Sequence, residues 1–186
     1  MIADENGIRF SGTRGHAFAW SYDEIQELRL EPRKLHILTY ADRRLRRGAD
    51  REFEFKGNLP VSELYPLWSR RMDQRFVAEL PEPAVSGFAI PVKHLKTIRG
   101  SEGTLVFGAD SVVYSARSAD SRTWRYSDID SISSFGPFQL TITTFERARS
   151  QYGGRKGFNF ELREPISEAR YNEIWLQIEK KNGRIQ

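Results

Sequence analysis

The hydrophobic pattern of the chain consists mainly of short runs that favour strands, and two of these runs alternate apolar and polar residues. A period of two, with β-branched and aromatic residues at the apolar positions, is typical of half-buried strands. Residues 53–55 and 158–160 alternate in this way. Residues 35–40 and 140–145 are rich in residues that favour strands, and residues 112–115 and 123–126 fit strands too. Gly136-Pro137 and Glu31-Pro32 mark turns before two of these strands. The pattern therefore predicts several antiparallel strands joined by short turns.

Two other segments have the period of a helix. Each begins with a proline and a serine followed by a glutamate, which favours a helix start. The apolar positions are Leu64, Trp68, Met72 and Phe76 in the first segment, and Tyr171, Ile174, Trp175 and Ile178 in the second. The second set falls at i, i+3, i+4 and i+7, so one helix face is apolar. Pro66 predicts that the first helix starts late, near Tyr65, or is kinked.

The chain also repeats itself. Residues 20–25 (WSYDEI) reappear as 124–129 (WRYSDI), an offset of 104, and an offset of 105 aligns residues 32–63 with 137–168 without a gap. Eleven of those 32 aligned pairs are identical, where average residue usage gives roughly two by chance. The sequence therefore predicts two copies of one unit, each made of strands followed by one helix.

The element order and the motif Trp-x-Tyr-x-[Asp/Glu]-Ile at 20–25 and 124–129 together resemble the pleckstrin-homology-like (PH-like) superfold, especially bacterial PH and GRAM-type domains. The resemblance implies a mainly β (α+β) fold. Each unit would be a bent antiparallel β-barrel or sandwich closed by one C-terminal helix. It also implies a binding or scaffolding role without catalysis. Basic residues in the first loop often mark members that bind phosphoinositides, but here residues 108–111 (GADS) are not basic.

We therefore expect a first unit at 1–79, a linker at 80–100 and a second unit at 101–186. Residues 103–107 look like a first strand, and only residues 1–3 remain as their counterpart in the first unit. Three explanations stay open for this bare edge: the linker at 87–90 covers it, a partner or second copy covers it, or upstream sequence has been removed.

Positive charge is concentrated in two places, although the chain carries only +4 overall. Residues 42–51 and residues 146–156 each have a net charge of +3, and both lie in the same predicted loop of their unit. We expect these loops to form paired anion-binding tips, through Arg43, Arg44, Arg46, Arg47, Arg51, Arg147, Arg149, Arg155 and Lys156. The alternative is that charged hairpin ends only keep exposed edges soluble.

The predicted function is a non-enzymatic adaptor that contacts an anionic membrane or an acidic protein surface. Nucleic-acid binding is the alternative, because residues 152–158 (YGGRKGF) mix aromatic and basic side chains. An enzyme of unrecognised type is the third hypothesis. The N-terminal residues resemble no signal peptide, so the expected location is cytoplasmic or peripheral to a membrane, or exported if a leader has been removed.

Little in the sequence points to catalysis. There is no cysteine, and the three histidines, His16, His36 and His94, do not recur between the copies. Neither the sequence motifs of metal sites nor those of phosphate loops occur. We therefore expect no metal and no cofactor. The four tryptophans, Trp20, Trp124, Trp68 and Trp175, recur in matching places and are predicted to be core residues.

Overall fold

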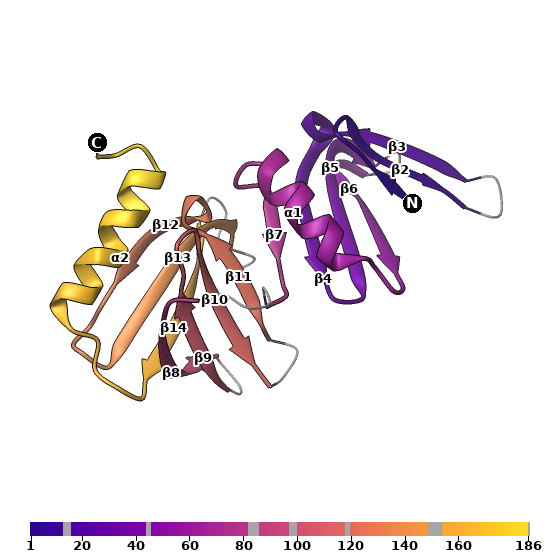
Figure 1. Ribbon diagram of the computed structural model, residues 1–186. Coiled ribbons are helices and arrows are strands. Elements are labelled where there is room, and N and C mark those ends of the chain that lie inside the picture. The colour runs from indigo at the N-terminus through magenta and orange to yellow at the C-terminus, as the bar shows by residue number, and fades with distance from the viewer. Residues whose placement is uncertain are drawn as a thin grey trace. The chain divides into compact units, whose positions relative to one another are not determined.

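The computed structural model describes residues 1–12, 16–43, 46–81, 86–96, 100–117, 120–148 and 154–185, with backbone only at 42, 43 and 46–49. The chain divides into two compact units, Met1–Ala78 and Glu79–Gln186. The described residues are mainly β, with two α-helices, one of them near the C-terminus (Figure 1). The prediction of a mainly β fold with a C-terminal helix is therefore confirmed.

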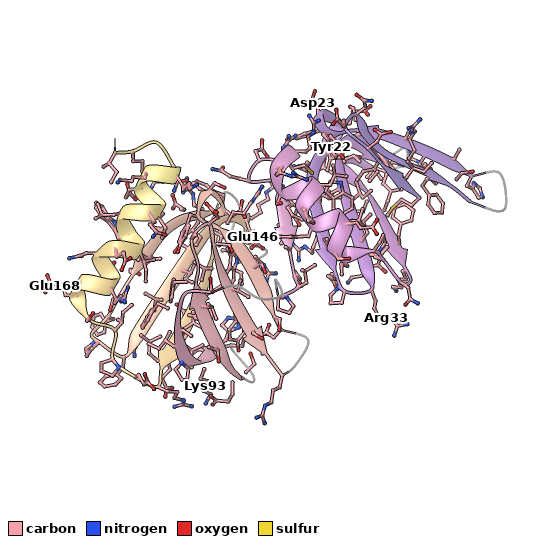
Figure 2. The ribbon with its side chains drawn as sticks, viewed as in Figure 1. Tyr22, Asp23, Arg33, Lys93, Glu146 and Glu168 are labelled. Atoms are coloured by element: carbon pink, nitrogen blue, oxygen red, sulfur yellow. The ribbon has the colours of Figure 1, made fainter. Side chains whose placement is uncertain are left out.

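Unit 1 contains two groups of strands. The first is an antiparallel sheet of β1 (Ile2–Ala3), β2 (Gly7–Ser11) and β3 (Ala17–Ser21). The second has the order β7-β4-β5-β6, with bounds Ile25–Glu31 for β4, Lys34–Arg43 for β5, Arg46–Lys56 for β6 and Phe76–Ala78 for β7. Only β7 runs parallel to its neighbour, β4. Arg33, in the turn between β4 and β5, projects away from the unit (Figure 2).

The helix of unit 1, α1 (Val61–Arg71), begins directly after Pro60 and continues through Pro66. The predicted late start near Tyr65 is therefore wrong. Trp68 on α1 is fully buried, and its ring centroid lies 6.0 Å from that of Phe76 in β7. The apolar face of α1 thus helps to form the core of its unit.

Unit 2 contains seven described strands in the order β12-β13-β14-β8-β9-β10-β11, all antiparallel to their neighbours. Their bounds are Phe88–Leu95 (β8), Ser101–Phe107 (β9), Ser111–Ala116 (β10), Arg122–Arg125 (β11), Ile129–Ser133 (β12), Gln139–Arg147 (β13) and Arg155–Leu162 (β14). The strands β11 and β12 follow one another in the chain but do not pair, so the sheet does not close into a barrel.

The second helix, α2 (Glu168–Lys181), follows β14 and packs on β12 (Figure 1). Ser167 caps it by accepting a hydrogen bond from the N–H of Arg170, while Glu168 extends away from the sheet (Figure 2). Ile174 and Ile178 are buried, but Trp175 is 39% exposed. The prediction that Trp175 is a core residue is therefore wrong, because α2 turns Ile174 and Ile178 inward instead.

The expected linker also needs correction, because residues 88–95 form the strand β8. Ile90, Val92 and His94 face the core, while Pro91, Lys93 and Leu95 face outward. The alternation is hidden in the sequence because one inward residue is a histidine and two outward residues are proline and leucine. Pro91 is tolerated because it lies just beyond the last registered pair between β8 and β14, Val92 with Leu162.

The repeated motif forms the same local structure in both units. A short 3-10 helix covers Tyr22–Glu24 in one unit and Tyr126–Asp128 in the other. The Glu24 carboxylate accepts a hydrogen bond from the N–H of Ser21, and Asp128 accepts one from the N–H of Arg125. The following isoleucines, Ile25 and Ile129, are fully buried. The acidic residue of the motif thus closes a turn and the isoleucine anchors the next strand.

Strand registers in the two units are related by the offsets found in the sequence. Ile8 pairs with Trp20 as Val112 pairs with Trp124, at an offset of 104. Leu35 pairs with Phe55 as Leu140 pairs with Phe160, at an offset of 105. Both units also have a register shift after the first pair of their next hairpin, between Ile25 and Glu27 and between Ile129 and Ser131.

Trp20 and Trp124 lie at equivalent places in these registers and are 8% and 2% exposed. Each tryptophan ring meets a phenylalanine edge-on from a strand that is not its neighbour in the sheet: Trp20 meets Phe53 of β6 with centroids 4.7 Å apart, and Trp124 meets Phe158 of β14 at 4.9 Å. The Trp124–Phe158 pair belongs to the buried core of unit 2, whereas Phe53 of the unit 1 pair is only partly buried.

Candidate anion-binding site

Both basic segments lie at the ends of long hairpins. The β5–β6 hairpin of unit 1 ends at the pair Arg43 and Arg46, and the β13–β14 hairpin of unit 2 ends at Arg147 and Arg155. The structure thus places Arg43, Arg46, Arg47 and Arg51 on strands of unit 1, and Arg147, Arg155 and Lys156 on strands of unit 2. Arg44 and Arg149, and the side chains of Arg43, Arg46 and Arg47, lie outside the described residues.

Arg51 is the arginine of the unit 1 basic segment whose side chain is described. It is exposed, and its guanidinium lies 5.0 Å from the ring centroid of Phe53 and 5.9 Å from that of Phe18. Because these rings are part of the core face, the aromatic surface holds the charge in place while leaving it accessible to solvent.

In unit 2 the corresponding cations bind carboxylates of their own unit. Lys156 Nζ lies 3.1 Å from Glu146 Oε2, and Arg155 forms an ion pair with Asp130. The Arg155 guanidinium also lies 4.6 Å from the ring centroid of Phe145. Much of the positive charge at this hairpin is therefore balanced internally.

The two carboxylates are themselves well held. Asp130 also forms an ion pair with Arg184 at 2.7 Å. Burial alone would raise the pKa of Asp130, but the hydrogen bonds from Arg155 and Arg184 outweigh the effect of burial and lower the pKa. Glu146 is buried and also binds Arg122 Nη1 at 2.7 Å. Breaking such a pair would leave a buried charge, so these contacts stabilise the hairpin rather than leave it open to a ligand.

The aligned positions in unit 1 carry no such carboxylates. By the same offsets, Gln26 stands where unit 2 has Asp130, and Ala41 stands where it has Glu146. The acidic residues in or beside the unit 1 basic segment are instead Asp42, Asp50 and Glu52. Asp42 and Asp50 pair across the hairpin backbone. The sequence predicts two similar basic tips. In the structure, part of the positive charge at the unit 2 tip is balanced by ion pairs within that unit.

A polar cluster in unit 2 was missed by sequence reasoning. Asp120 accepts hydrogen bonds from Lys96 and Ser101, and its Oδ2 lies 2.9 Å from His94 Nδ1. Ser101 Oγ is also 2.9 Å from the hydroxyl of Tyr114. These residues come from β8 and the residue directly after it, from β9 and β10, and from the segment after β10, so their spacing in sequence gives no signal.

The geometry of this cluster does not match nucleophilic catalysis. In a serine triad the histidine lies between the serine and the acid, whereas here Ser101 and His94 both bind Asp120 directly. Burial lowers the pKa of His94, and Asp120 partly opposes this effect. Burial would raise the pKa of Asp120, but its hydrogen bonds with Lys96, Ser101 and His94 keep it below the usual value. The half-buried carboxylate of Asp120 thus connects His94 of β8 with Ser101 of β9.

Among the described residues, no group of three or more His, Asp or Glu side chains could hold a metal ion. None of the helices in this part of the chain is both long and apolar enough to cross a membrane. In comparisons with known proteins, the sequence matches no protein-family model and no curated protein.

Proposed function

We propose that the chain is a non-catalytic binding module of two PH-like units, and that the end of the β5–β6 hairpin contacts an anionic partner surface. The partner would be phospholipid headgroups or an acidic protein face. Unit 2 supports the PH-like assignment through its strand order: its last strand, β14, pairs back with its first, β8, and the chain then enters α2. The shared strand registers support the same assignment for unit 1.

The observation that carries the anion-binding proposal is the difference between the two hairpins. Five arginines fall within residues 43–51, at the end of a hairpin where Gln26 and Ala41 replace the two carboxylates that bind cations in unit 2. A fold that needed these cations only for internal ion pairs would be expected to retain the carboxylates. Residues 42–51 keep a net charge of +3 even when Asp42 and Asp50 are counted, and an external anion can neutralise this charge.

The expected affinity is modest. A basic residue near an anionic membrane contributes about 1 kcal/mol, so Arg43, Arg44, Arg46 and Arg47 together would give ~4 kcal/mol, or roughly millimolar binding. Such an interaction would be reversible and sensitive to salt, because the charges lie at an exposed hairpin end.

Co-sedimentation with vesicles tests this proposal. The full chain should pellet with phosphatidylserine-containing vesicles at low salt, or bind poly-glutamate in a parallel assay if the partner is an acidic protein face. Changing Arg43, Arg44, Arg46 and Arg47 together to glutamine should weaken the interaction by roughly 1,000-fold, that is, below detection.

A matched control replaces four exposed cations elsewhere, Arg33, Arg70, Lys180 and Lys181, with glutamine. This control has the same net charge as the hairpin variant and should bind as the wild-type chain does. Equal loss in both variants would mean that only net charge matters. Binding of an oligonucleotide in preference to vesicles and poly-glutamate would instead favour the nucleic-acid alternative.

A further inference from the structure

One strand joins the two halves of the sheet in unit 2 and has no counterpart in the described part of unit 1. The strand β8 pairs with β14 on one side and with β9 on the other. In unit 1 the corresponding strands are the end strands of two separate sheets, β6 in one and β1 in the other.

The correspondence of these edges follows from the registers. Ala3 of β1 pairs with Ile8 as Phe107 of β9 pairs with Val112, at the offset of 104. The short strand β1 therefore occupies the place of the end of β9. The sequence left open whether residues 87–90 cover the bare first edge of unit 1. Residues 88–90 are part of β8 in unit 2 and pair there with β9.

The backbone N–H and C=O groups of β6 point toward and away from β5 at the same positions at which those of β14 point toward and away from β13. The N–H of Gly57 donates to the carbonyl of Arg33, as the N–H of Leu162 donates to that of Phe138. One residue later, the N–H of Arg163 donates at 2.9 Å to Pro91 in β8. Since successive residues of a strand point their N–H groups to opposite sides, the backbone of Glu54 and Lys56 faces away from β5.

Side chains next to this edge are more exposed in unit 1 than their counterparts in unit 2. Phe158 and Phe160 are 4% and 1% exposed, and the His94 ring from β8 lies 4.9 Å from Phe160. Phe53 and Phe55, at the equivalent positions of β6, are only partly buried. Phe10, which takes the place of the buried Tyr114, is also partly buried.

We infer that unit 1 binds an extended segment of a partner protein, which pairs antiparallel with β6 in the place that β8 holds in unit 2. Addition of a strand to an open sheet edge is a common mode of peptide recognition, in which backbone hydrogen bonds give affinity and alternate side chains give specificity. This inference uses the sheet edge of unit 1 and does not depend on the anion-binding proposal.

The structure of β8 specifies the chemistry of that segment. Its residues should alternate between inward and outward positions as those of β8 do. Because His94 lies opposite Phe160, the residue in the place of His94 should face Phe55, the counterpart of Phe160. In unit 2 the outward Lys93 lies opposite Glu161, whose counterpart in unit 1 is Lys56. Because opposite charges across strands are favourable, the segment should carry an acidic residue opposite Lys56.

Fluorescence anisotropy with two labelled peptides tests this inference on the full chain. One peptide has the sequence of residues 87–95 (GFAIPVKHL), and the other has glutamate in place of Lys93. The glutamate peptide should bind about two- to five-fold more tightly, and Lys56→Glu should reverse this preference. Lys180→Glu, which makes the same charge change at an exposed position of α2 in unit 2, should leave the preference as in the wild-type chain.

A second variant tests whether the peptide binds at the edge of β6. Glu54→Pro removes an N–H that faces away from β5, so the fold should persist by circular dichroism while peptide binding is lost. Three outcomes would overturn the inference: neither peptide binds, binding survives Glu54→Pro, or the wild-type chain sediments as a dimer that Glu54→Pro converts to monomer. The last result would identify a second copy as the occupant.

Discussion

The tryptophans show how a repeated residue can have different roles in two copies. Trp20, Trp124 and Trp68 are buried, but Trp175 is 39% exposed on α2. The offset that aligns the strands pairs Trp68 with Glu173 rather than with Trp175. An identical residue in a helical pattern therefore predicts burial only when its phase on the helix is also matched.

The first prediction follows from this difference. Trp124→Ala should lower the free energy of unfolding by about 3–5 kcal/mol, because it empties the centre of unit 2. Trp175→Ala should change it by only about 1 kcal/mol or less, since the side chain is already partly in water. Urea unfolding followed by circular dichroism measures both variants, and a large loss for Trp175→Ala would contradict the position of α2.

A second residue-scale prediction concerns acid stability. Since burial lowers the pKa of His94 below the ordinary 6.5, the unfolded chain takes up a proton at a pH where the folded chain does not. The free energy of unfolding should therefore fall as the pH drops below about 6.5, and lowering of the Asp120 pKa should add a further loss in more acidic solution.

This prediction can be isolated with His94→Gln, which should remove the part of the pH dependence that begins near pH 6.5. His16→Gln replaces an exposed histidine and should keep the wild-type dependence. Urea denaturation at a series of pH values measures both. An unchanged slope in His94→Gln would show that His94 is not held neutral by its burial.

Among the elements, hairpins and helices are the parts that the sequence predicted well. Runs that favour strands, such as residues 35–40 and 140–145, form β5 and β13, and the repeated motif marks the same turn in both units. The strand β8 was missed because Pro91 resembles a chain break and His94 occupies an inward position. The strand β7 has only three residues, too few to show a period.

Because β6 and β14 occupy equivalent places in the two units, the same substitution can be made at matched positions, Glu54 and Asn159. Asn159→Pro should lower the free energy of unfolding by about 2 kcal/mol or more, because Asn159 pairs with Leu95 and its N–H faces β8. Glu54→Pro, at the same place in β6, should cost clearly less because no described strand lies beside that edge. Thermal unfolding of the two variants under identical conditions compares these costs, and equal destabilisation would indicate that β6 is already paired.

For the whole molecule, the sequence predicted two similar units and two similar basic tips. The shared registers support the first expectation, but the charge balance of the tips differs. That difference could not be read from the basic segments alone, because the neutralising residues, Asp130 and Glu146, come from β12 and β13 and meet the cations only in the folded unit. The polar cluster around Asp120 was hidden for the same reason.

The central claim is that the end of the β5–β6 hairpin in unit 1 contacts an anionic partner, while its counterpart in unit 2 is held by internal ion pairs. The most direct measurement is an amide chemical-shift titration of the ¹⁵N-labelled full chain with phosphatidylserine nanodiscs and, separately, with poly-glutamate. We expect the largest shifts or line broadening at Arg43, Arg46, Arg47 and Arg51, with much smaller effects at Arg155 and Lys156. Equal effects on both hairpins, a larger effect on β13–β14, or no effect from either titrant would contradict the account.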